Sequence, residues 1–248
     1  MNHQVVVITG ASGGIGAAIG ELLATRGMSV VLVARRRETL EAVAARCGAN
    51  TFAIVADMAR RSDVRHVVDS ALARFGTIDV WINNAGQGIT RQPSELTDED
   101  VDAMMRANVK TALYGMQEIL PHFKSRNAGQ IINISSMLGR LPFAVQRSAY
   151  SAAKHFLNAL TTMIRMELQQ SHPGIQVTLV SPGVVATDFG LNAIHGGVDS
   201  RQLPEAQSPQ DVAAVVAGAI ESRKPDVYTR RGAQERIAAY YASLGSDA

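Results

Sequence analysis

Tyr150 and Lys154 stand one helical turn apart in the segment SAYSAAK, residues 148–154, so they can share one helix face. An ammonium beside a phenol can lower the pKa of the phenol from about 10 toward neutrality. A hydroxyl tuned in this way can donate or accept a proton during catalysis. The alternative interpretation is a structural pair, in which an exposed lysine only covers a packed tyrosine.

A glycine-rich turn, TGASGGIG at residues 9–16, ends the first apolar run and opens a segment of helical period. Glycines let the backbone turn tightly and approach a pyrophosphate, and the following helix N-terminus offers free N–H groups and a partial positive charge. An ordinary turn can also hold glycine, but four glycines within residues 10–16 favour a phosphate site. The gap from Gly10 to Gly14 is wider than in the general dinucleotide fingerprint. With the tyrosine and lysine pair, this turn indicates a hydride-transfer enzyme.

The end of the second apolar run indicates which dinucleotide would bind. An NAD site places an acidic residue here for the ribose 2′-hydroxyl, but this chain has Ala34 followed by Arg35, Arg36 and Arg37. Three cations at the start of a helix oppose its dipole, so a bound anion would explain them. Because guanidinium groups bind phosphate in bidentate fashion, we predict NADP(H), with Arg35 as the main contact and Arg36 as the next. A solvated basic turn is the alternative.

Short β-branched runs alternate with longer segments of helical period, which predicts a parallel sheet with helices on both faces. The predicted strands are residues 5–9, 30–34, 51–56, 78–83, 130–135, 175–181 and, more weakly, 227–229. The predicted helices are residues 14–26, 37–47, 62–75, 97–125, 150–170 and 208–222, the fourth with a hydroxyl cap at Thr97. The chain of 248 residues therefore fits one Rossmann-type α/β domain over residues 1–248, a doubly wound sheet of about seven parallel strands.

Composition excludes several classes of function. The net charge is only +2 and no long basic stripe is present, so we expect neither nucleic acid nor a membrane surface as a partner. No run of about 18 apolar residues occurs and the N-terminus lacks a basic leader, so neither membrane spanning nor export is indicated. The single cysteine, Cys47, excludes an internal disulfide and fits a reducing, cytoplasmic compartment. The histidines, His3 among them, show no metal-ligand spacing with carboxylates, so no metal site is expected.

Residues 188–207 form an unusually long irregular stretch that is rich in Gly, Asn, Ser and Pro. Loops of this length inside compact domains are more often functional lids than spacers, so we expect a mobile segment that covers the substrate. An ordinary surface excursion is the alternative. Residues 138–147 should line the same pocket, and residues 230–248 should form a short amphipathic helix with a frayed tail.

Further motifs follow the predicted strands in chain order. They are Asn83-Asn84-Ala85-Gly86 after the fourth strand, Asn108 in the long helix, Ser135-Ser136 after the fifth strand, and Pro182-Gly183 with Thr187 after the sixth. Together with the glycine turn and the tyrosine and lysine pair, these motifs make the chain resemble the short-chain dehydrogenase/reductase family, in its NADP-preferring type, over essentially its whole length.

The resemblance implies a role for each motif. Tyr150 would be the acid/base, Lys154 would lower its pKa and hold the nicotinamide ribose, and Ser136 would orient the substrate oxygen. Asn108 would support a proton-relay water, although a satisfied core amide is the alternative for a polar residue on an apolar stripe. Asp57, at the end of the third strand, would accept the adenine amino group or serve as a plain turn residue. The predicted cofactor site comprises Gly10, Ser12, Gly14, Ile15, Gly16, Arg35, Arg36, Asp57, Met58, Asn84, Ala85, Gly86, Tyr150, Lys154, Pro182, Gly183, Val185 and Thr187.

Carbonyl reduction needs Tyr150 and Ser136 on chemical grounds as well. Charge builds on the oxygen as hydride arrives at carbon, so a proton donor and a second hydrogen-bond donor must lie near that oxygen. The spacing from Ser136 to Tyr150 is one residue longer than is usual in the family, and the usual spacing would reach Met137, which cannot donate. We place the extra residue within 140–147 and keep Ser136, with Ser135 as the alternative.

These observations predict an NADPH-dependent enzyme that reversibly reduces a small-molecule carbonyl compound to an alcohol. The alternatives are an NAD-dependent alcohol dehydrogenase of the same fold and a non-catalytic NADPH sensor. The resemblance also implies a homodimer or homotetramer formed through the two long helices. Neither the substrate nor the choice between dimer and tetramer follows from the sequence.

Overall fold

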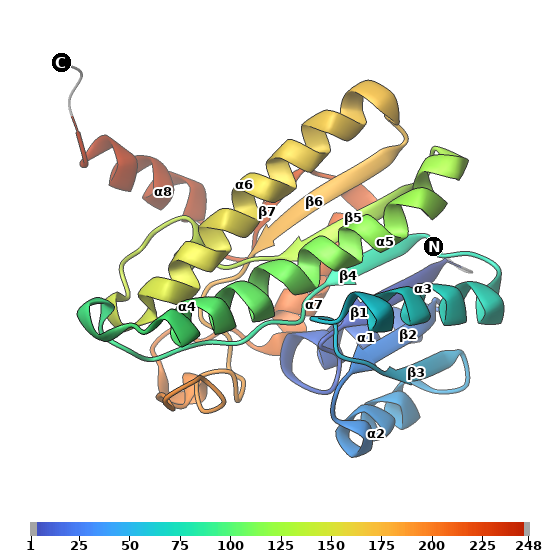
Figure 1. Ribbon diagram of the computed structural model, residues 1–248, viewed down its shortest axis with the longest axis horizontal. Helices are drawn as coiled ribbons and strands as arrows, with labels where there is room; N and C mark the ends of the chain where they lie inside the picture. Colours follow the sequence, from blue (N-terminus) through green and yellow to red (C-terminus); the bar gives the residue numbers. More distant parts are fainter. Residues whose placement is uncertain (1–3, 246–248) are drawn as a thin grey trace.

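Seven parallel strands form one sheet in the computed structural model, which describes residues 4–245 (Figure 1). Both ends of the chain, His3 and the C-terminal tail included, lie outside the described residues. The strands pair in the order β3-β2-β1-β4-β5-β6-β7, and the predicted doubly wound α/β fold is confirmed. Their bounds are β1 Val5–Thr9, β2 Ser29–Ala34, β3 Thr51–Val55, β4 Val80–Asn83, β5 Gly129–Ile134, β6 Ile175–Ser181 and β7 Asp226–Tyr228.

Helices cover both faces of this sheet. One face carries α1 (Gly14–Thr25), α2 (Arg37–Cys47) and α7 (Pro209–Ser222), and the other carries α3 (Arg61–Phe75), α5 (Thr111–Arg126) and α6 (Ser148–Ser171). Figure 1 shows α5 and α6 lying across the near face of the sheet. Most strand residues are buried and apolar, so the sheet contributes to an apolar cluster on each face. Within residues 4–245, no helix combines the length and the apolar character needed to cross a membrane.

Most predicted boundaries lie within about two residues of the observed ones, but the helix predicted over residues 97–125 is not uniform. It begins as α4 (Asp98–Met105), where Thr97 and Asp100 form a capping box, so the predicted hydroxyl cap is confirmed. Residues 106–110 then form a π-helical turn before α5 begins. A π turn inserts a residue into a helix and frequently marks a functional site. Asn108, one of the predicted site residues, lies in this turn.

Two segments outside the sheet complete the fold. The long loop at residues 188–207 is irregular apart from the 3-10 turn Ser200–Gln202, and a parallel bridge joins its Ile194 to Ile89. The predicted C-terminal helix is present as α8 (Ala233–Ala242), which packs Ile237 and Tyr240 into a small apolar cluster with Leu141.

A chain of buried hydrogen bonds links β4, β5 and α6 beneath α5. Trp81 Nε1 donates to Asn83 Oδ1 at 2.8 Å, Asn83 Nδ2 donates to Asn133 Oδ1 at 2.8 Å, and Asn133 Nδ2 donates to Thr161 Oγ1 at 2.9 Å. Gly115 of α5 lies directly over this chain, because a Cβ atom there would be 2.2 Å from Asn83 Oδ1. The glycine therefore lets α5 approach the strands that end at the site.

We expect Gly115→Ala to destabilise the fold by about 1–3 kcal/mol, because the added methyl group must displace buried polar atoms. Gly218→Ala in α7 is the matched control, since nothing lies within 4 Å of its added Cβ. The control should be neutral or gain up to about 1 kcal/mol from helix propensity. Urea unfolding followed by circular dichroism measures both changes. Equal midpoints for the two variants would contradict the packing described for α5.

Candidate active site

A cavity of about 1230 Å³ opens at the carboxyl ends of the strands and reaches the switch in strand order between β1 and β4. Ligand pockets of single small molecules usually measure about 300–1,000 Å³, so this one has the volume for a dinucleotide with a second molecule. Crevices at such switch points are the usual ligand sites of doubly wound sheets. Every predicted site residue lines the cavity except Gly16 and Asn108.

The glycine turn has the backbone geometry that a phosphate site needs. Gly10 has a positive φ of 66°, and a Cβ atom there would be 2.8 Å from Ala85 Cα, so only glycine fits. At Gly16, a Cβ atom would be 2.4 Å from the Gly10 carbonyl oxygen, so this residue holds the turn together without lining the cavity. No side chain caps α1 at Gly13, which leaves the first N–H groups of the helix for an anion.

Hydrogen bonds lock the turn after β4 against the glycine turn. Thr9 Oγ1 accepts from the backbone N–H of Asn84 at 2.9 Å and from that of Ala85 at 3.1 Å. In return, Asn84 Nδ2 donates to the carbonyl oxygens of Thr9 at 3.0 Å and Gly10 at 3.1 Å. This turn, which belongs to the predicted cofactor site, is thus fixed by contacts that need no ligand.

Two exposed arginines lie at the same end of the cavity. Arg35 and Arg36 line it, and Arg36 Nη2 donates to Ser12 Oγ at 3.2 Å. Within residues 4–245, neither guanidinium has a carboxylate within 4.0 Å. Asp57 also lines this end and accepts the Ala59 backbone N–H on Oδ1 at 3.0 Å, which suits a turn residue and leaves Oδ2 for another donor.

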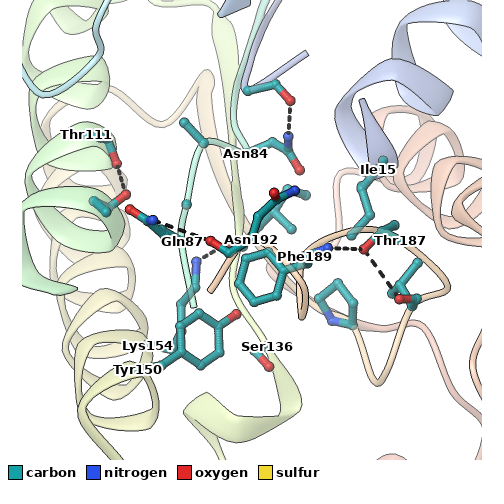
Figure 2. Close-up of a pocket in the computed structure, with 18 of the residues that line it drawn as sticks. Ile15, Asn84, Gln87, Thr111, Ser136, Tyr150, Lys154, Thr187, Phe189 and Asn192 are labelled. Atoms are coloured by element: carbon teal, nitrogen blue, oxygen red, sulfur yellow. Dashed lines mark hydrogen bonds between the residues drawn. The ribbon is translucent and has the colours of Figure 1, made fainter. Parts of the chain in front are cut away.

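Tyr150, Ser136 and Lys154 come together at the other end of the cavity. Figure 2 shows the Tyr150 hydroxyl and the Ser136 hydroxyl on the same side of the pocket, with the Lys154 side chain beside the tyrosine ring. Lys154 Nζ is 5.7 Å from the ring centroid and donates to the Ile134 carbonyl oxygen at 3.0 Å. Ser135 is engaged elsewhere, because its Oγ donates to Asn158 Oδ1 at 2.5 Å, so the geometry favours Ser136 over Ser135.

Burial controls the protonation of Tyr150 and Lys154. It raises the pKa of Tyr150 to about 12, although the neighbouring Ser136 hydroxyl and the Arg147 guanidinium act in the opposite direction. Burial also lowers the pKa of Lys154 from 10.5 to about 8. Lys154 is not among the groups that shift the pKa of Tyr150 in the protein alone, so the expectation that it lowers the phenol pKa stays a prediction. The phenol is protonated at neutral pH.

Asn108 lies behind the cavity wall. Its Nδ2 donates to the carbonyl oxygen of Gln87 at 2.9 Å and to that of Met104 at 3.2 Å, while its Oδ1 accepts the Gln87 backbone N–H at 3.3 Å. Both ends of the amide are thus paired, as in a satisfied core amide, and the π turn faces its side chain toward Gln87. The relay role implied by the resemblance stays a prediction.

The segment after β6 joins the two ends of the cavity. Thr187 approaches the glycine turn, since a Cβ atom at Gly14 would be 3.2 Å from Thr187 Cγ2. Thr187 Oγ1 accepts the Phe189 backbone N–H at 3.3 Å, and the Phe189 ring packs edge-on against Tyr150 at 5.5 Å between centroids. The loop at residues 188–207 therefore contributes to the site wall as predicted, while its mobility stays a prediction. No periodic signal singles out Phe189, because it lies in irregular chain.

The described histidines have no metal-ligand arrangement. His195, on the long loop, lies 2.8 Å from the Asp100 carboxylate, which also contacts Arg91 at 3.4 Å. Between residues 4 and 245, no three His, Cys, Asp or Glu side chains are grouped as metal ligands would be.

With this geometry in place, comparison with known proteins identifies the class. Residues 4–195 match the family model described as short chain dehydrogenase. This match covers more than half of the chain, and we conclude that the chain belongs to the short-chain dehydrogenase family.

Individual relatives support this assignment. An uncharacterized oxidoreductase of Staphylococcus aureus (strain USA300) is 34% identical over 227 residues, which cover 90% of this chain and 94% of the relative. The crystal structure of an alcohol dehydrogenase from Thermococcus sibiricus, complexed with 5-hydroxy-NADP, is 26% identical with a TM-score of 0.80, covering 92% of this chain and 96% of the other. A short-chain dehydrogenase/reductase from Burkholderia phymatum, in complex with NAD, shares the fold with a TM-score of 0.88 at 24% identity, covering 100% and 98% of the two chains.

The depressed pKa of Lys154 predicts a pH-dependent stability. Between pH 8 and pH 10.5 the unfolded chain binds more protons at this residue than the folded protein does. The free energy of unfolding should therefore rise with pH across this window in the natural protein, relative to Lys154→Met, which lacks the group. Urea unfolding of both proteins between pH 8 and pH 10 measures the difference, and a constant difference would mean that Lys154 is not desolvated.

Proposed function

We propose that this protein is an NADPH-dependent oxidoreductase that reversibly reduces a carbonyl compound to an alcohol. The observation that carries the proposal is the meeting of Tyr150, Ser136 and Lys154 in the same cavity as the glycine turn. A hydride donor bound along that cavity would extend from the glycine turn at one end to the proton donor at the other. Membership of the short-chain dehydrogenase family supports this assignment.

The chemistry follows from the protonation of the site. Reduced nicotinamide, when bound, supplies a hydride to the carbonyl carbon and is oxidised as the carbonyl is reduced. Tyr150 gives its proton to the carbonyl oxygen, so the product carries a new C–H bond and a new O–H bond. Ser136 donates a hydrogen bond to the same oxygen and stabilises the charge that develops there. Because burial keeps the Tyr150 pKa at about 12, the phenol holds its proton at neutral pH, which suits the reducing direction.

Lys154 has a place in both binding and proton transfer. Its ammonium is held by the Ile134 carbonyl oxygen and lies near Gly86, where a Cβ atom would be 3.7 Å from Nζ. From there it can donate to the nicotinamide ribose, and its positive charge favours a phenolate on Tyr150 when the reaction runs toward oxidation. Asn108 is proposed to support a relay water beside Lys154, and its bonds to Gln87 hold that part of the wall.

NADPH is the proposed cofactor. The supporting features are an alanine at the end of β2 and two arginines, Arg35 and Arg36, that have no carboxylate partner within residues 4–245. Relatives of this fold bind either NAD or an NADP analogue, so the fold alone does not choose between them.

We also propose that the protein is cytoplasmic and that it forms a homodimer or homotetramer. The assembly is proposed because Phe156, Met163 and Met166 leave an apolar strip exposed on α6. A monomeric molar mass in solution would contradict that assembly.

Tyr150→Phe should lower carbonyl reduction by about 10²–10⁴-fold, because the proton donor is removed while the ring remains. NADPH binding, followed by the change in cofactor fluorescence, should stay close to that of the natural protein. Ser136→Ala should also reduce kcat. Undiminished turnover of Tyr150→Phe across a broad panel of ketones and aldehydes would refute the mechanism. If NADPH binds but the natural protein reduces no carbonyl compound, the sensor alternative is favoured.

Arg35→Ala should raise the KM for NADPH by about tenfold or more and leave the KM for NADH unchanged, because only NADPH carries the 2′-phosphate. Arg37→Ala is the matched control. Its guanidinium lies 3.3 Å from the Glu41 carboxylate and does not line the cavity. Turnover measured with both cofactors and all three proteins decides the question, and a natural protein that prefers NADH would contradict the assignment.

A further inference from the structure

Arg147 places a guanidinium in the wall of the active-site cavity, three residues before Tyr150. It ends the 3-10 turn Val145–Arg147, directly before α6, and lines the same cavity as Tyr150 and Ser136. Its side chain is partly buried, and its positive charge opposes, without outweighing, the burial that raises the pKa of Tyr150. The proposed reduction of a carbonyl group gives this cation no role.

The guanidinium is held between two backbone segments. Nη1 donates to the Ile89 carbonyl oxygen at 3.0 Å, which fixes the plane of the group. Two glycines make room for it, because a Cβ atom at Gly88 would be 3.0 Å from Nη1 and one at Gly197 would be 2.9 Å from Nη2. The turn after β4 and the long loop therefore both leave a place for this one side chain.

No carboxylate neutralises Arg147. Within residues 4–245 none lies within 4.0 Å of it, whereas four arginines on nearby segments do have carboxylate partners: Arg91 with Asp100, Arg140 with Asp226, Arg201 with Asp188 and Asp199, and Arg230 with Glu205. Arg147 Nη1 donates to the Ile89 carbonyl oxygen. Neither of the other two guanidinium nitrogens is both fully buried and without a hydrogen-bond partner. The remaining donors of the fork are thus accessible to solvent in a residue that lines the cavity. A partly buried cation without an anion is unfavourable, so a bound anion would stabilise it.

This end of the cavity has polar as well as apolar walls, and its polar residues include Asn192, Ser200 and Asp188, which is paired with Arg201. Leu138, Phe143, Phe189 and Leu203 also line this end, and Phe189 packs against the Tyr150 ring. A substrate that fits these walls carries an apolar group, a carbonyl beside Tyr150 and one negative charge on the Arg147 side. A planar carboxylate matches the fork of a single guanidinium in bidentate fashion.

We infer that Arg147 binds the carboxylate of the substrate, so that the enzyme acts on oxo acids and the corresponding hydroxy acids with an apolar substituent. This inference rests on the proposed carbonyl reduction at Tyr150. Arg147 would then determine specificity, because it contacts the carboxylate of the substrate and not the carbonyl carbon that reacts. An ester of the same acid keeps the carbonyl and the apolar group and loses only the charge.

Two acids and their esters test the inference: benzoylformate and benzoylpropionate, each compared with its ethyl ester in NADPH oxidation. The natural protein should have a higher kcat/KM for at least one acid than for its ester. Arg147→Gln should lower kcat/KM for that acid by about tenfold or more and change the value for the ester by less than about threefold, since a charge-assisted pair is lost only with the acid. Arg147→Lys should recover part of the loss. Arg91→Gln, which removes a paired arginine outside the cavity, should leave the ratio of acid to ester unchanged.

Binding provides a readout that does not depend on turnover. Calorimetric titration of mandelate, the alcohol formed from benzoylformate, into the protein with NADP⁺ should show weaker binding to Arg147→Gln than to the natural protein. The thermal unfolding midpoints of Arg147→Gln and the natural protein should agree, so that a loss of binding is not a loss of folding.

The outcomes separate this inference from the proposed function. Equal losses for acid and ester would mean that Arg147 only tunes Tyr150, and the inference would be overturned. Reduction of neutral ketones with rejection of both acids would overturn it as well, while carbonyl reduction itself would stand. If a broad panel of ketones, aldehydes and oxo acids yields no turnover, the proposed function fails and the inference fails with it.

Discussion

The bond between the Lys154 ammonium and the Ile134 carbonyl oxygen is the constraint on which the site depends. It joins the first part of α6 to the last residue of β5 at 3.0 Å. Tyr150 comes one helical turn before the lysine, and Ser136 comes two residues after Ile134, so this one contact sets the proton donor and the second donor opposite each other. A shift of α6 along the sheet would separate Tyr150 and Ser136.

The same contact explains why the site is built at a cost to stability. Lys154 is buried, and the desolvation that lowers its pKa to about 8 also raises that of Tyr150 to about 12. A site that was selected only for stability would place apolar residues at both positions. A directional hydrogen bond holds Lys154 on the Ile134 carbonyl oxygen, and other buried polar groups nearby are paired in the same way, as in Ser135 with Asn158. Packing alone would not fix their orientation.

The sequence predicted the fold and a set of site residues most of which line the cavity, because both follow from local patterns. Parallel strands alternate with helices in chain order, and their carboxyl ends lie at one edge, so motifs that follow strands must converge there. The π turn at residues 106–110 could not be predicted, since its composition is compatible with ordinary helix and its Asn108 bonds to Gln87, a residue 21 positions away in the chain. The rise of the Tyr150 pKa on burial could not be predicted for a related reason. Sequence spacing shows which charges are near a group, whereas desolvation depends on what buries it.

The two ends of the cavity differ in how much local sequence determines them. At the glycine turn the binding groups are backbone atoms and strand-end side chains, held by Thr9 and Asn84, so residue types and spacing are enough to predict a dinucleotide. At the substrate end the wall comes from loops that are far apart in the chain, with Arg147 fixed by Ile89 and given space by Gly88 and Gly197. Its unpaired charge becomes visible only when every nearby carboxylate is placed in three dimensions. Substrate preference in such a fold is therefore a property of tertiary contacts, while cofactor class is largely a property of single strand-to-helix turns.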